Sequence, residues 1–411
     1  MKRPLRRGSD KRFAWPKVTF EFNWKIIALY GAGFAFVCTL YLWNIGSLPG
    51  GYSKNEALQA IASSSLSEIW QNPVGSPHKL LTYWYGFFVN DLLATRLASV
   101  TFAILAVILF YILVRQWHSK IVSVWATLLF AAAASMLHIG RWGGEMIVPA
   151  AMLLALLVIG LYAKYGTSNY SVWPLLCCTL LIAGSLYVPG MVWIVLLLLI
   201  LGWRTGAIFL GRYSMLFKAG ALALLLVLLI PLVWYIAKQP ADGLLAIAGF
   251  SQHPATITDG LKAVGFAPIH AFYGGYQDSE LWLGKVPLLD AFSLTMLLLG
   301  IYYYVFRYRK LKRSPLIICL VIFSFLLTSL SDYWLIPLFI VGIFFLISAG
   351  LQEMSNRWLT VFPRNPLAKN TGLVLLSCMV ALAMFYNMQH YFVAWPKAPE
   401  TKQVYIVQRN E

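Results

Sequence analysis

A short polar stretch, Ser53-Lys54-Asn55-Glu56, follows the first long apolar run and holds the first residues of the chain that could do chemistry. Ser53 and Glu56 have the spacing of a capping box, in which each side chain accepts a hydrogen bond from the other residue's backbone amide. The pattern predicts an amphipathic helix over residues 54–69. A carboxylate at the rim of a polar cavity, beside apolar surface, is also suited to accept a proton from an attacking hydroxyl group. Glu56 therefore has two compatible interpretations, a helix cap and a general base.

Basic residues near the ends of apolar runs are the second group with chemical potential. Arg96 and Arg141 each lie where a charge is costly unless it is paired or faces a polar cavity. A guanidinium is a planar fork of donors that suits phosphate. His78 and Lys79 follow a proline at a predicted membrane interface, and they are either ordinary interfacial anchors or contacts for an anionic head group.

Acids complete the set of candidate residues. Glu145 stands close to Arg141 and either neutralises it or lines the same site. Asp91 is a further acid on the predicted outer side, and a later loop adds more titratable residues: His253, His270, Asp278 and Glu280. No metal-ligand spacing such as HExxH occurs, so a divalent metal is not expected. No GxGxxG, Walker A or GxSxG motif stands in the right context, which leaves nucleotide-driven transport and serine hydrolysis without support.

The elements that must position these residues belong to a membrane protein. The chain is 60% hydrophobic and only 11% charged, with a mean hydropathy of +0.71, whereas soluble domains are about 25% charged. The net charge of +17 comes mainly from basic residues at the ends of apolar runs, not from a nucleic-acid reader motif. The five cysteines form no CxxC pair or ligand cluster, so neither disulfides nor a zinc site are predicted.

Apolar runs of spanning length predict an all-α polytopic fold with about eleven transmembrane helices. The predicted spans are 26–43, 97–114, 122–138, 146–163, 172–187, 190–203, 219–237, 286–306, 315–330, 333–350 and 371–388. The segment 80–93 is predicted as one more partial helix, either interfacial or embedded.

Most of the 32 Lys and Arg fall on one side of these spans, and "RYRKLKR" (307–313) marks that side most clearly. The positive-inside rule then places the N-terminus in the cytoplasm and the C-terminus outside. The predicted organisation is a basic cytoplasmic N-terminus (1–25), one transmembrane domain (26–388) and an external tail (389–411). Two long external loops, about 44–96 and 238–285, are expected to carry juxtamembrane helices and function.

The order and spacing of several segments resemble GT-C type membrane glycosyltransferases, in particular the protein O-mannosyltransferase and lipid A aminoarabinose-transferase family. The segments that carry the likeness are, in chain order, "SKNEALQ", "GSPHKLLTYW", "TRLASVTFAILAVILFYILVR", "HIGRWGGEMIVPAAMLLALL", "VPLLDAFSLTMLLLGIYY" and "YFVAWPKAPETKQVY". The likeness covers nearly the whole chain. It implies an enzyme of the cytoplasmic membrane that moves a sugar from a polyprenyl-phosphate carrier to a protein, lipid or glycan acceptor on the external face.

The resemblance also implies roles for residues. An acid of the first loop would take the proton of the acceptor hydroxyl, and Glu56 matches the second acid of the family's pair while Asn55 stands in place of the first. Asn55 would orient the acceptor or a sugar hydroxyl. The lipid phosphate would be held by basic residues, for which the candidates are Arg141, Arg96, His78 and Lys79. No cofactor beyond the donor lipid is expected.

Because Asn55 cannot act as a base, three outcomes are open. Glu56 serves as the base, another acid such as Asp91, Glu145 or Asp278 does, or the protein is a relative without catalytic activity. A transporter or lipid-carrier flippase is the alternative from another class. It would require broken helices at the midplane, inverted repeats and paired charges within the spans. No repeat is visible in the sequence, and the spans are almost free of ionisable groups.

Overall fold

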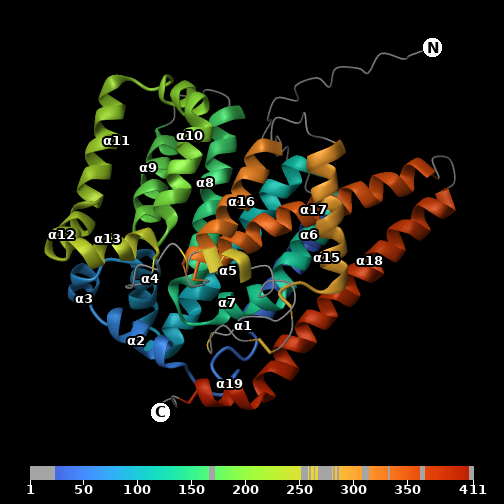
Figure 1. Cartoon of the computed structure of the whole chain (residues 1–411), viewed down its shortest axis with the longest axis horizontal. Coiled ribbons are helices and arrows are strands. Elements are labelled where there is room, and N and C mark those ends of the chain that lie inside the picture. Colours follow the sequence, from blue (N-terminus) through green and yellow to red (C-terminus); the bar gives the residue numbers. More distant parts are fainter. Residues whose placement is uncertain are drawn as a thin grey trace.

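The computed structural model describes residues 24–165, 172–250, 258, 261–262, 264–266, 280, 283–284, 287–307, 314–331, 334–361 and 366–406. Every regular element within these ranges is a helix, as the composition predicts (Figure 1). Nearly all of the predicted cytoplasmic N-terminus, the "RYRKLKR" marker beyond Arg307, and the candidate acid Asp278 lie outside the described residues.

Five helical segments are long and apolar enough to cross a membrane: Asp91–Trp117 (α5), Glu145–Lys164 (the 3₁₀ turn η1, Glu145–Ile147, with α8, Val148–Tyr165), Met191–Leu210 (α10), Ile336–Val361 (α17), and Asn370–Lys397, which includes most of α18 (Pro366–Gln389). Two bent pairs raise the number to seven if each pair is one span. They are α6 (Lys120–Ala132) with α7 (Ala134–Arg141), and α11 (Met215–Leu228) with α12 (Ile230–Lys238). The chain is a helical membrane protein.

Shorter apolar helices account for the remaining predicted spans: α1 (Trp24–Leu42), α9 (Trp173–Leu186), α15 (Ala291–Tyr302), which continues into the π-helical turn η3 (Tyr303–Arg307), and α16 (Ser314–Leu330). Each of the predicted spans thus coincides with a helix or a bent helix pair. That all of them cross a membrane, with the N-terminus inside, stays a prediction.

The core of the bundle lies around α17, of which 94% of the apolar window is buried, against 17% for α10. Close approach of α15 and α17 depends on two glycines. A β-carbon at Gly300 would lie 1.9 Å from the carbonyl oxygen of Leu346, and one at Gly350 would lie 1.9 Å from that of Met296. Small residues at such contacts are a common way to pack helices in a membrane. The helices α5 and α7, which carry candidate site residues, both contact α17.

The first long loop folds into three short helices at one end of the bundle: α2 (Lys54–Ala62), α3 (Leu66–Gln71) and α4 (Ser76–Gly86) (Figure 1). The predicted single helix over 54–69 is wrong. It breaks after Ala62 because the Ser65 hydroxyl accepts a hydrogen bond from the amide of Glu68 and starts a new helix. The predicted partial helix over 80–93 is confirmed over residues 80–86, which belong to α4, but its end is wrong, since α4 ends at Gly86 and Asn90 caps the start of α5.

Later parts of the chain return to the same end. The second long loop begins with α13 (Pro240–Ala248), and the predicted external tail continues α18 through a π-helical turn η4 (His390–Ala394), a 3₁₀ turn η5 (Trp395–Lys397) and α19 (Pro399–Val404). Trp395 and Tyr405 are buried, with their rings packed edge to face. Figure 1 places α19 beside the end that carries α2 and α3, and the connection between α10 and α11 at the opposite end.

Candidate functional site

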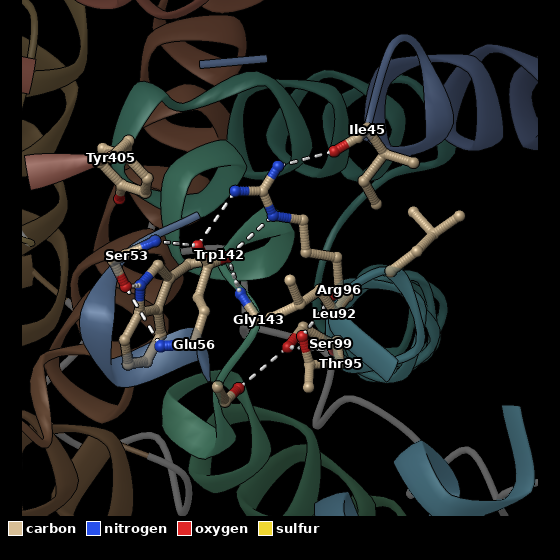
Figure 2. Close-up of polar contacts among 12 residues, drawn as sticks. Ile45, Ser53, Glu56, Leu92, Thr95, Arg96, Ser99, Trp142, Gly143 and Tyr405 are labelled. Carbon is tan, nitrogen blue, oxygen red and sulfur yellow. Dashed lines mark hydrogen bonds and ion pairs between the residues drawn. The ribbon is translucent and has the colours of Figure 1, made fainter. Parts of the chain in front are cut away.

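Glu56 is fully buried, and its carboxylate accepts four hydrogen bonds from three parts of the chain (Figure 2). The backbone amide of Ser53 donates to Oε2 over 2.8 Å, which together with the Ser53 hydroxyl confirms the predicted capping box. The amide of Gly143, just beyond α7, donates to Oε1 over 2.8 Å. Nε and Nη2 of Arg96, on α5, donate to Oε1 and Oε2 over 2.8 Å and 3.0 Å.

Arg96 is equally engaged. Besides Glu56, its guanidinium donates to the carbonyl oxygens of Ile45, Leu48 and Gly51 over 2.8, 3.3 and 2.6 Å. The ring of Tyr52 covers its face at 4.0 Å. All five N–H groups of a guanidinium are thereby matched. Arg96 holds the loop between α1 and α2 onto α5, and no donor is left for the lipid phosphate that the sequence suggested for it.

Arg141 caps the C-terminal end of α1. Its guanidinium donates to the carbonyl oxygens of Leu40 and Tyr41 over 3.0 Å each, and to that of Trp43 over 2.7 Å. These are C-terminal carbonyls that lack partners within the helix, and a cation there also complements the helix dipole. Glu145 forms no ion pair with Arg141, so the expectation that it neutralises this arginine is wrong.

His78, Lys79 and Glu145 gather in the interior beneath α4, with 0%, 3% and 8% of their surfaces exposed. The expectation that His78 and Lys79 are interfacial anchors is therefore wrong. His78 Nε2 lies 2.9 Å from Ser99 Oγ, and Lys79 donates to the carbonyl oxygen of Asn72 over 2.8 Å. Burial lowers the pKa of His78 to about 3, and it lowers the pKa of Lys79 against the opposing charge of Glu145.

Glu145 and Gly75 meet in this interior cluster. Oε2 of Glu145 is buried without a hydrogen-bond partner and occupies the space where any other residue at position 75 would place its β-carbon, 1.3 Å away. Gly75 has a φ of +75°, a conformation that L side chains rarely adopt. The glycine of "GSPHKLLTYW" thus serves the packing of Glu145 under α4.

Asn55 and Glu280 form the exposed counterpart of the buried ion pair. Asn55 immediately precedes Glu56 in the first turn of α2 and is exposed. Its Nδ2 donates to Oε2 of Glu280 over 2.9 Å. Its backbone amide donates to Oε1 of the same carboxylate over 3.4 Å. The carbonyl oxygen of Glu280 accepts from His138 Nε2 over 2.6 Å and from the Tyr405 hydroxyl over 3.5 Å.

The predicted site residues therefore divide into separate groups. Glu56 and Arg96 form an ion pair, Arg141 caps α1, and Asp91 is exposed in the first turn of α5. Glu280 is an acid of the second loop that the sequence does not assign to the site. It lies 225 residues from Asn55, so no local spacing connects the two. Its predicted external position was the one signal in the sequence.

The arrangement places a half-buried carboxylate, Glu280, beside the exposed Asn55, which shares helix α2 with Glu56 of the buried Glu56–Arg96 ion pair. Within the described residues, no three His, Cys, Asp or Glu side chains are grouped so that they could hold a metal ion. That no metal takes part stays a prediction.

Comparison of the chain with protein-family models and with curated proteins finds no match.

Proposed function

We propose that this protein is a membrane glycosyltransferase that moves a sugar from a polyprenyl-phosphate carrier to an acceptor at the external face of the cytoplasmic membrane. The resemblance of the ordered segments to GT-C enzymes motivates the proposal. One structural observation supports it most: Glu56 holds the first turn of α2 to α5 through its ion pair with Arg96, and to the chain after α7 through the Gly143 amide, while Asn55 stays exposed.

The geometry bears on which residue is the base. A base must accept a proton from a hydroxyl group that can reach it. Glu56 is buried with four N–H donors on its carboxylate, and Glu145 is buried beneath α4. These surroundings favour a positioning role for Glu56 and, among the three open outcomes, the one in which another acid is the base.

The cations would act at a distance. All donors of Arg96 are occupied, and Arg141 donates to three carbonyl oxygens, so the proposal gives both cations long-range stabilisation of the negative charge on the leaving phosphate. Arg141 Nε is buried without a hydrogen-bond partner and is therefore a donor that a closer contact could use.

The test is turnover of a defined donor. The purified protein in lipid nanodiscs would be given polyprenyl-phosphate sugars one at a time, with envelope lipids, glycans or proteins as acceptors, and release of polyprenyl phosphate would be followed by mass spectrometry. We expect one donor to be consumed with a matching mass gain on an acceptor. If no donor is consumed or bound, the protein is not such an enzyme, and an inactive scaffold becomes the better explanation of Asn55.

A further inference from the structure

We infer that Glu280 is the general base of the transfer and that Asn55 holds its carboxylate in place. The inference rests on the proposed function and adds a catalytic residue that the first-loop motif does not contain. It starts from one contact: two donors of the same residue, the side-chain and backbone N–H groups of Asn55, meet the two carboxylate oxygens of Glu280.

Accessibility separates Glu280 from the other acids near the site. Glu56 is fully buried and Glu145 is 8% exposed, whereas Asn55 is exposed and Glu280 is half-buried against it. An acceptor hydroxyl group arriving from the external side can therefore approach Glu280 while Glu56 stays out of reach. Geometry comes before pKa in choosing a base, and only Glu280 among these three satisfies it.

The backbone of Glu280 is fixed as well as its side chain. Its carbonyl oxygen accepts hydrogen bonds from His138 on α7 and from Tyr405 in the tail. His138 lies one turn before Arg141 on α7, so the same helix positions the carboxylate and a buried cation. Three elements far apart in the sequence thus converge on this single acid, which suits a group that must be held within a fraction of an ångström.

The identity of Asn55 follows from this contact. A carboxylate at position 55 would stand 2.9 Å from Glu280, and two carboxylates that close share a proton because both cannot ionise readily. An amide instead donates to the charged form of Glu280 and stabilises it. The amide of Asn55 in the first loop and the carboxylate of Glu280 in the second loop are therefore complementary. Glu280 supplies the acid that the first loop lacks at position 55.

The reaction step balances without a metal or an oxidant. The acceptor hydroxyl oxygen forms a bond to C1 of the sugar while the bond from C1 to the phosphate oxygen breaks. The electron pair of that bond leaves with the phosphate, which gives free polyprenyl phosphate. The hydroxyl proton passes to the Glu280 carboxylate and from there to water.

The test compares Glu280→Gln with the wild type in the donor-consumption assay, and uses Glu400→Gln as the matched control. Glu400 is an exposed acid of α19 at the same end, so the control makes the same change of charge outside the site. We expect kcat to fall at least about 100-fold in Glu280→Gln, the usual contribution of a general base. The Kd for the donor should be unchanged, which also shows that the variant is folded, and Glu400→Gln should match the wild type.

Chemical rescue of kcat distinguishes a general base from a residue with a purely structural role. In Glu280→Ala, added sodium formate should restore part of kcat because it supplies a carboxylate in the vacated space. Transfer by Glu280→Gln at more than about a third of the wild-type rate, far above the loss expected for a base, would overturn the inference and leave the proposed function standing. A wild-type protein that consumes no donor would instead overturn the proposed function, and the inference with it.

Discussion

The substitution Glu56→Gln removes one charge from the buried Glu56–Arg96 ion pair while it keeps the shape of the side chain. The carboxylate accepts four hydrogen bonds, from Ser53, Gly143 and twice from Arg96. A glutamine has a single acceptor oxygen, and its amide N–H groups would face the donors that remain. Arg96, with 1% of its surface exposed, would be left as a buried charge without its partner.

The cost can be estimated from these contacts. Breaking a buried ion pair by removal of one partner typically costs about 3–5 kcal/mol of the free energy of unfolding. With an unfolding entropy of about 2.1 cal/mol/K per residue, a chain of 411 residues would lose about 3–6 °C of Tm. The measurement is thermal unfolding of the purified protein in nanodiscs, followed by tryptophan fluorescence.

The control is Glu68→Gln, which makes the same chemical change at an exposed acid of α3. Its effect should stay within about 0.5 kcal/mol, as for most surface substitutions. If Glu56→Gln were as stable as Glu68→Gln, the ion pair would not secure the first loop, and the positioning role of Glu56 would be wrong. Loss of transfer in Glu56→Gln identifies a base only if stability is retained.

Three further predictions concern other parts of the site. The folded-state pKa of His78, lowered to about 3, lies below its unfolded value, so the protein loses stability as the pH falls. Between pH 7.5 and pH 5 this group costs about 2 kcal/mol, and unfolding in His78→Gln should be correspondingly less sensitive to acid over that range. Gly75→Ala should lower the free energy of unfolding by about 2–4 kcal/mol because of its φ of +75° and the carboxylate in its path, whereas Gly160→Ala, with open space around it, should change it by about 1 kcal/mol or less. The double variant Asn55→Asp/Glu280→Gln exchanges the amide and the carboxylate. In the transfer assay it should be at least about tenfold faster than Glu280→Gln alone, since it restores a carboxylate that can act as a general base. An equal rate would mean that the two positions are not interchangeable.

Local features of the sequence predicted local structure well. The apolar runs mark the helices, and the capping box at Ser53 forms as expected because both partners lie within one turn. The break before α3 carried the same kind of signal, since Ser65 and Glu68 repeat the capping spacing. A longer amphipathic pattern across the break concealed it.

Contacts between distant segments could not be predicted in this way. Nothing near Glu56 indicates that Arg96 and the amide of Gly143 will surround it, and nothing near Asn55 indicates Glu280. The positive-inside pattern predicts the side on which a charge lies, but it does not predict its depth. His78 and Lys79 were for that reason expected at the interface, although the packing of α4 on α5 buries them.

The three parts of the chain that donate hydrogen bonds to Glu56 are made one after another, because the chain is synthesised from its N-terminus. The carboxylate emerges first, its cation follows 40 residues later on α5, and the Gly143 amide follows 87 residues after Glu56. During synthesis the first long loop can contact α5 before α7 is in place, but the Glu56 carboxylate gains its last donor only once the chain beyond α7 has been made. The bent α6–α7 pair must therefore be in place before the set of donors around Glu56 is complete.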